Sequence, residues 1–158
     1  MDFLLSELLH ENTMTAKVTV ASRDEAIEYI GNLMVNNSQI TKNYILAMKN
    51  VFSELGPYAV IAPGIVLLHA RPEDGVIKTS LGMITLKTPV VFGHSQNDPV
   101  DLVFALAARD KEQHIKALVE LANLLSRHQF LTKIRKAQNS KDLYKAVILS
   151  TSLEMKRK

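Results

Sequence analysis

The chain has no cysteine among its 158 residues, which excludes disulfides, thiolate metal sites and cysteine nucleophiles. It also has no apolar run near the roughly 18 residues that a membrane-spanning helix requires. Its first nine residues, MDFLLSELL, carry acidic groups and no basic residue, so they do not resemble a signal peptide. These absences together favour a cytoplasmic protein.

Motifs for several common chemistries are missing as well. There is no GxxxxGK[ST] phosphate-binding loop, no GxGxxG dinucleotide fingerprint, no HExxH zinc motif and no GxSxG nucleophile elbow. Without cysteine, a zinc site would require His69, His94 and His114 to converge with a carboxylate on folding. A metal-dependent hydrolase is therefore an alternative that rests only on the presence of several histidines.

Length and composition predict one globular domain spanning residues 1–158, with 47% apolar and 22% charged residues. A chain of this length buries about 68–70% of the surface that it exposes when unfolded, enough for a proper core. The net charge of +3 comes from scattered basic residues, with few aromatics and no recognised reader motif, so nucleic-acid binding is not expected. A mildly basic face could still help to dock an acidic partner protein.

Hydrophobic periodicity predicts helices towards both ends of the chain. A short amphipathic helix with Phe3, Leu4 and Leu8 facing the core comes first. Ser22 and Glu25 form a capping-box pattern that begins the next helix, and a further helix starts near Thr41 and ends at Gly56-Pro57. Three more helical patterns, at about 115–125, 130–134 and 143–148, finish the chain.

The middle of the chain favours strands, after one over 15–20. Tyr58 to Leu68 is apolar and β-branched but is broken by Pro63-Gly64, which predicts two strand pieces. Residues 83–86 and 90–92 are expected as two short strands, and the apolar run 102–108 as a strand buried on both faces. Helices before and after a group of strands predict an α/β fold, a mixed sheet sandwiched between helices in three layers (α/β/α).

His69 lies where the apolar segment 56–68 meets the polar loop Ala70-Arg71-Pro72-Glu73. An imidazole in such a place can be held rigidly while one ring nitrogen faces solvent. Its other nitrogen should then donate to a carbonyl or carboxylate, which the sequence does not identify. A neutral imidazole can attack phosphorus and form a covalent phosphohistidine, although a histidine with one satisfied hydrogen bond at a strand end is the simpler interpretation.

His114 falls near the first turn of a predicted helix, because Asp110 is a plausible N-cap and Gln113 would complete a capping box. Unpaired backbone N–H groups and the helix dipole stabilise anions at this end, so a side chain there could help to hold a phosphoryl group. A surface histidine beside the apolar stripe is the alternative. His10 and His128 are expected on the surface, and His94 in an ordinary turn.

The segment GPYAVIAPGIVLLHARPE, residues 56–73, resembles the active-site segment of sugar phosphotransferase-system enzyme IIA proteins of the mannitol/fructose type. The residues Gly75-Val76, Phe92-Gly93, 97–100 and the run 106–108 before Gln113-His114 resemble that family too. The likeness runs from about Glu7 to Leu149. The form His-Ala-Arg-Pro-Glu is most similar to the ascorbate-specific branch.

This resemblance implies a mannitol-type enzyme IIA-like fold and a phosphoryl relay without metal or organic cofactor. His69 matches the histidine that takes a phosphoryl group, at Nε2, from the histidine phosphocarrier protein and passes it to a cysteine of the cognate enzyme IIB. His114 matches a second histidine that helps to stabilise the transferring group. The membrane enzyme IIC would be an indirect partner, and ascorbate the carbohydrate. A regulatory phosphohistidine module acting on a bound protein is the alternative.

The chain departs from the family at one point. Many mannitol and fructose members place an Arg-Glu pair upstream of the histidine, whereas residues 49–54 here are KNVFSE. If that arginine binds phosphate, another cation must replace it. Arg71, two residues after His69, is expected to lie near the phosphoryl group.

Overall fold

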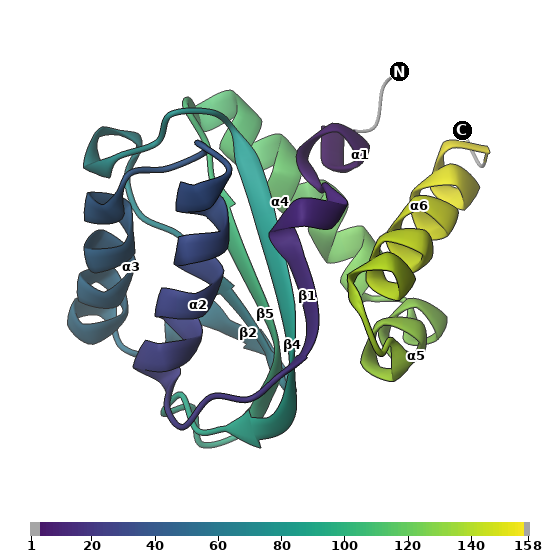
Figure 1. The fold of residues 1–158 in the computed structure, drawn as a ribbon, viewed down its shortest axis with the longest axis horizontal. Helices are drawn as coiled ribbons and strands as arrows, with labels where there is room; N and C mark the ends of the chain where they lie inside the picture. Colours follow the sequence, from purple (N-terminus) through teal and green to yellow (C-terminus); the bar gives the residue numbers. More distant parts are fainter. Residues whose placement is uncertain (1–3, 157–158) are drawn as a thin grey trace.

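The computed structural model describes residues 4–156 and forms a central sheet between two layers of helices (Figure 1). Its strands are β1 (Met14–Val18), β2 (Val60–Ala62), β3 (Ile65–Leu68), β4 (Ser80–Val90) and β5 (Val100–Ala107). Its helices are α1 (Leu4–Leu8), α2 (Arg23–Asn36), α3 (Lys42–Leu55), α4 (Lys111–Leu125), α5 (His128–Lys136) and α6 (Ser140–Lys156). Short 3-10 turns lie at Glu11–Thr13, Pro57–Ala59 and Pro72–Asp74.

The strands are ordered β1-β4-β5-β3-β2, and the sheet is mixed. β3 runs parallel to β5, with Ile65 opposite Leu102 and Leu68 opposite Ala105. β1 is also parallel to its neighbour β4, whereas β4–β5 and β2–β3 are antiparallel. Because β3 and β5 are parallel, their carboxyl ends meet at one edge of the sheet.

Side chains alternate along the strands, so the sheet separates two cores. Figure 1 shows α2 and α3 on one side of the sheet and α1, α4, α5 and α6 on the other. Leu67, Phe104 and Leu106 belong to the core under α4, whereas Leu68 and Ala105 belong to the core under α2 and α3. The expected three-layer α/β/α architecture is confirmed.

The helix boundaries follow the expected local signals. Ser22 caps α2 by accepting from the Glu25 N–H at 3.2 Å, and Gly56 ends α3 with a positive φ of 77°. The capping box of α2 differs in one bond, because the Glu25 carboxylate accepts from the Ala21 N–H instead of the Ser22 N–H. Of the predicted first helix, Leu8 is buried, while Phe3 and the side chain of Leu4 lie outside the described residues.

The two separate short strands expected at 83–86 and 90–92 are not found: residues 83–86 and Val90 lie in the single strand β4, and residues 91–92 lie beyond its end, so this prediction was wrong. β4 continues through exposed Lys87, Thr88 and Pro89 to Val90, with a register shift after Thr85. β1 pairs with β4 only as far as Leu86, so one side of β4 is an edge beyond that point and tolerates a proline. Residues 87–89 therefore mark the point at which β4 becomes exposed, not the end of the strand.

The segment before β2 also differs from the prediction. Tyr58 lies in a 3-10 turn and is 84% exposed, and β2 begins only at Val60. The break at Pro63-Gly64 is confirmed as the turn between β2 and β3. None of the described helices combines the length and apolar character needed to cross a membrane.

Candidate active site

His69 directly follows the last residue of β3 and lies at the sheet edge where β3 and β5 both end. By strand alternation its side chain follows Leu67, on the face covered by α4. All four residues of β3 are buried, which fixes the backbone immediately before the histidine. The sheet therefore holds the imidazole at the boundary between core and solvent, as the sequence predicted.

His114 is brought to the same edge by the short connection from β5 to α4. Asp110 caps the helix, accepting from the Gln113 N–H at 2.8 Å, and His114 is the fourth residue of α4. The His69 and His114 ring centroids are 5.4 Å apart, with 58° between the ring planes. Two half-buried imidazoles thus share one site although 45 residues separate them, the difference between 114 and 69.

The Gln113 side chain does not complete the expected capping box. It pairs with the Thr79 hydroxyl, which in turn accepts from the Arg109 N–H at 3.0 Å. The Gln113 side chain therefore connects the start of α4 to the segment before β4 and does not bond the N-cap residue of its own helix. This link fixes the first turn of the helix, and with it His114, against the sheet.

The Nδ1 atom of His69 is buried and has no hydrogen-bond partner among the described residues. The carbonyl or carboxylate expected to accept from this nitrogen is not found among the described residues. Burial of Nδ1 leaves Nε2 as the ring nitrogen that can meet an incoming reactant.

The pKa of His114 is lowered from its usual 6.5, chiefly because partial burial disfavours the charged ring and secondly because His69 is close. His114 is therefore mostly neutral at pH 7. A neutral His114 ring carries one N–H that it can offer as a hydrogen-bond donor beside His69. The arrangement suits transfer of an anionic group better than permanent binding of one.

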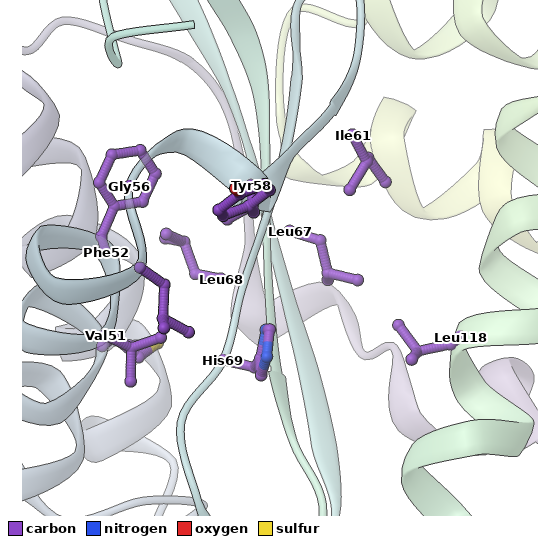
Figure 2. Close-up of a pocket in the computed structure, with 12 residues that line it drawn as sticks. Val51, Phe52, Gly56, Tyr58, Ile61, Leu67, Leu68, His69 and Leu118 are labelled. Carbon is purple, nitrogen blue, oxygen red and sulfur yellow. The ribbon is translucent and has the colours of Figure 1, made fainter.

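An apolar cavity of about 240 Å³ opens beside His69. Figure 2 shows the imidazole between Val51 and Phe52 of α3 and Leu118 of α4, with Tyr58 nearby. Further lining residues are Met48, Leu55, Gly56, Ala59, Ile61, Leu67 and Leu68. Leu55, Tyr58 and Ile61 are about half or more exposed, so the apolar surface around the histidine reaches solvent.

Comparison with known proteins decides the family. A family model described as "Phosphoenolpyruvate-dependent sugar phosphotransferase system, EIIA 2" matches residues 7–150. The chain belongs to this family. It is thus a phosphoryl-relay component of a sugar phosphotransferase system, with a transferase role.

Individual relatives agree with this enzyme IIA assignment. The chain is 31% identical to the ascorbate-specific EIIA component of Salmonella typhi, covering 89% of this chain and 92% of the relative. The solution structure of the mannitol-specific cryptic enzyme IIA of Escherichia coli is 30% identical, with a TM-score of 0.79 over 90% of this chain and 97% of that one. The mannitol enzyme IIA of Escherichia coli, solved in complex with phosphorylated IIB, shares the fold, with a TM-score of 0.77 at 23% identity over 89% and 96% of the chains.

Arg71 of this enzyme IIA lies close to His69 in a second depression of about 490 Å³, together with Asn50, Glu54 and Asp74. Its side chain is 74% exposed, and its Nε lies 3.5 Å from Asp74 Oδ2. It is the one cation among the described residues that line this depression. Lys49, in the upstream segment that departs from the family, instead pairs with Glu28 of α2.

The remaining histidines of the enzyme IIA lie where the sequence predicted. His10 and His128 are exposed, and His94 organises its own turn by accepting from the N–H groups of Gln96 and Asn97. Among the described residues, no group of three or more His, Asp or Glu side chains is arranged to hold a metal ion. His94 therefore does not join His69 and His114.

Sequence reasoning missed one polar group next to the enzyme IIA site, the hydroxyl of Tyr44. The sequence places Tyr44 on the apolar face of α3, and the ring is indeed fully buried. Its hydroxyl, however, lies 2.9 Å from the Ala70 nitrogen and 2.8 Å from the Leu106 oxygen. A tyrosine in an apolar helix stripe is the signal, because a buried tyrosine hydroxyl usually has a partner.

Proposed function

We propose that His69 carries the phosphoryl group in this enzyme IIA. Its Nε2 lone pair attacks the phosphorus of a phosphohistidine on the histidine phosphocarrier protein. The new N–P bond forms as the donor N–P bond breaks, and the donor imidazole leaves with the electron pair. A cysteine thiolate of the cognate enzyme IIB then attacks the same phosphorus, and His69 leaves as a neutral imidazole.

The observation that carries this proposal is the pair of adjacent imidazoles at the sheet edge, 5.4 Å apart, with His69 Nδ1 buried. His114 is proposed to donate a hydrogen bond to the phosphoryl oxygens as they pass. Stabilising groups already in position lower the barrier without reorganising during transfer. No metal or organic cofactor takes part in the proposed transfer.

The partners of the proposed relay are proteins that meet the apolar surface around His69. A structural relative, the mannitol enzyme IIA of Escherichia coli, forms a complex with phosphorylated IIB. By analogy, we propose a cognate enzyme IIB as acceptor, the histidine phosphocarrier protein as donor and a membrane enzyme IIC as an indirect partner. The likeness to an ascorbate-specific component makes ascorbate the proposed carbohydrate.

A phosphorylation assay tests this function. The protein is mixed with phosphoenolpyruvate, the kinase of the phosphocarrier and the phosphocarrier itself, and its mass is then measured. We expect a gain of one phosphoryl group that is labile in acid and that disappears on addition of an ascorbate-type IIB. If no mass is gained, the relay is wrong. A phosphoryl group that forms but never reaches any IIB protein would favour the regulatory alternative.

Replacing Arg71 by alanine should slow phosphoryl transfer by roughly ten- to a hundredfold, because a charge-assisted hydrogen bond to a phosphoryl oxygen is worth about 1.5–3 kcal/mol. The rate of phosphorylation by a limiting amount of phosphocarrier measures the effect. Arg23→Ala is the matched control, since Arg23 bonds the Phe92 carbonyl and stacks on Phe52 without lining either depression beside His69. Equal rates in the two variants would remove Arg71 from the site.

Replacing exposed Tyr58 by serine should raise the KM for the phosphocarrier or for IIB several-fold, because apolar area is lost from the surface that a partner would cover. The turnover number should stay close to the original, because the substitution removes exposed apolar area and none of the described hydrogen bonds joins Tyr58 to His69 or His114. Val91→Ser removes a side chain that is also exposed, at 70%, but does not line the cavity. A KM that rises equally in both variants would argue against this docking surface.

A further inference from the structure

The Tyr44 hydroxyl joins two strands at the point where His69 leaves the sheet. The last paired residues of β3 and β5 are Leu68 and Ala105. Beyond this pair, the Ala70 N–H donates to the hydroxyl oxygen at 2.9 Å, and the hydroxyl donates to the Leu106 carbonyl at 2.8 Å. The hydroxyl therefore links the two chain segments just beyond the last backbone pair of β3 and β5, where no backbone hydrogen bond joins Ala70 to Leu106 directly.

This bridge holds the residue directly after His69. The histidine backbone is thus fixed on one side by buried Leu68 and on the other by Ala70, which is bonded to Tyr44. Ala70 faces the core under α3, whereas His69 faces α4. Because neighbouring side chains on a strand point to opposite faces, anchoring Ala70 on one face sets the direction of the imidazole on the other.

The first turn of α3 also holds the rest of the loop that follows His69. The Asn43 side-chain amide donates to the Asp74 carbonyl at 2.9 Å, and the Thr41 N–H donates to the Gly75 carbonyl at 2.9 Å. Gly75 has a φ of 134°, and an added Cβ would collide with the Thr41 hydroxyl and lie tightly against Tyr44. Three successive contacts therefore attach residues 70–75 to α3.

We propose that Tyr44 is a positioning residue for phosphoryl transfer, one that holds the His69 imidazole against His114 through its bridge between Ala70 and Leu106. This inference rests on the proposed function of His69. Tyr44 itself touches neither the phosphoryl group nor a partner, because its side chain is fully buried. Its effect falls on the alignment of the nucleophile, where small displacements cost rate steeply.

The Tyr44 hydroxyl keeps its proton at and around neutral pH. Burial raises the pKa of Tyr44 to about 12, although the hydrogen bond with Ala70 opposes this rise, and the negative charge of Asp74 adds to it. The hydroxyl can therefore donate to Leu106 and accept from Ala70 at the same time near neutral pH. The bridge should not depend on pH until strongly alkaline conditions.

Tyr44→Phe removes the bridging oxygen and keeps the ring. We expect kcat for transfer from phosphocarrier to IIB to fall roughly tenfold with little change in KM, because docking surfaces are untouched and only alignment is lost. Native-state amide exchange should show the Ala70 N–H exchanging much faster in the variant. The wild-type protein is assayed alongside, so an inactive wild type would overturn the relay itself, and an unaffected variant would overturn only the role of Tyr44.

A control separates alignment from a general loss of stability. Ser140→Ala removes another hydroxyl that bonds a main-chain carbonyl, that of Met14 at 2.6 Å, on the other face of the sheet. This variant should keep its kcat and the slow exchange of Ala70. If both variants lose kcat in proportion to their stability, or if Ala70 exchange is unchanged in Tyr44→Phe, the positioning role is wrong.

A second variant covers the case in which Tyr44→Phe does not fold. Site-specific replacement of Tyr44 by 3,5-difluorotyrosine keeps the oxygen but lowers the pKa of the phenol. Its hydroxyl should lose the proton donated to Leu106 at a lower pH than in the wild type, and kcat should fall at that lower pH. Superimposable pH profiles for kcat would overturn the proposal.

Discussion

The His69→Gln variant should accept no phosphoryl group from the phosphocarrier. Glutamine retains polarity and approximate size but has no nucleophilic nitrogen, so the covalent intermediate cannot form. Loss of a covalent nucleophile lowers rates by on the order of 10⁴-fold or more in enzymes where it has been measured. Intact-mass measurement after incubation with phosphoenolpyruvate, kinase and phosphocarrier reads the effect directly.

The matched control for this prediction is His114→Gln, which changes the neighbouring ring in the same way. That variant should still gain one phosphoryl group, only more slowly, because the nucleophile remains. The two variants therefore assign different roles to two adjacent imidazoles. A phosphoryl group that persists in His69→Gln and vanishes in His114→Gln would reverse the assignment.

Most of the fold could be predicted because the relevant signals are local. The run 102–108 is apolar without alternation, and it forms β5, which is buried between two strands and two helix layers. Ser22 and Asp110 have cap chemistry that needs only the next few residues, and both cap their helices. Where the prediction was wrong, in β4, the deciding fact was the point at which β1 stops pairing. The end of this strand pairing depends on residues far apart in the chain, so no short stretch of sequence predicts it.

The same distinction applies to the site. The residues His69 and His114 could be picked out from a strand end and a helix start, and the parallel pairing of β3 with β5 then brings them together. The Tyr44 hydroxyl could not be found that way, because its partners Ala70 and Leu106 lie 26 and 62 residues away. The link between Gln113 and Thr79 is also long-range, and it replaced a bond that the local pattern had favoured. The reactive groups could therefore be predicted from the sequence, whereas the long-range hydrogen bonds that position them could not.

Phosphorylation of His69 should raise the pKa of His114. In the free protein the pKa of His114 is lowered, first by burial and then by the neighbouring His69. A phosphoryl group on His69 would place negative charge beside the second ring, and a nearby opposite charge favours the protonated imidazole. An NMR titration of the His114 ring in the free and phosphorylated proteins checks this. A pKa that is unchanged or lower on phosphorylation would mean that His114 does not face the phosphoryl group.

The lowered pKa of His114 makes the free energy of unfolding depend on pH. Between the lowered folded value and the unfolded value of 6.5, the unfolded chain binds more protons at this position. Stability contributed by His114 is therefore present above pH 6.5 and is lost as the pH falls from there towards the folded pKa. Denaturant unfolding at a series of pH values should show this loss in the free protein and not in His114→Gln.

A pKa of His114 that is lowered in the free protein and rises on phosphorylation would suit the proposed relay. In the proposed relay, a neutral His114 would donate one hydrogen bond to the incoming phosphoryl group, and uptake of a proton from solvent after transfer would strengthen that bond by adding charge. Release of the phosphoryl group to the acceptor would remove the anion, and His114 would then return its proton to solvent. His114→Gln can donate but cannot change charge, so we expect transfer to IIB to slow by about 10²–10³-fold. A rate within a factor of two of the wild type would show that a fixed donor is sufficient.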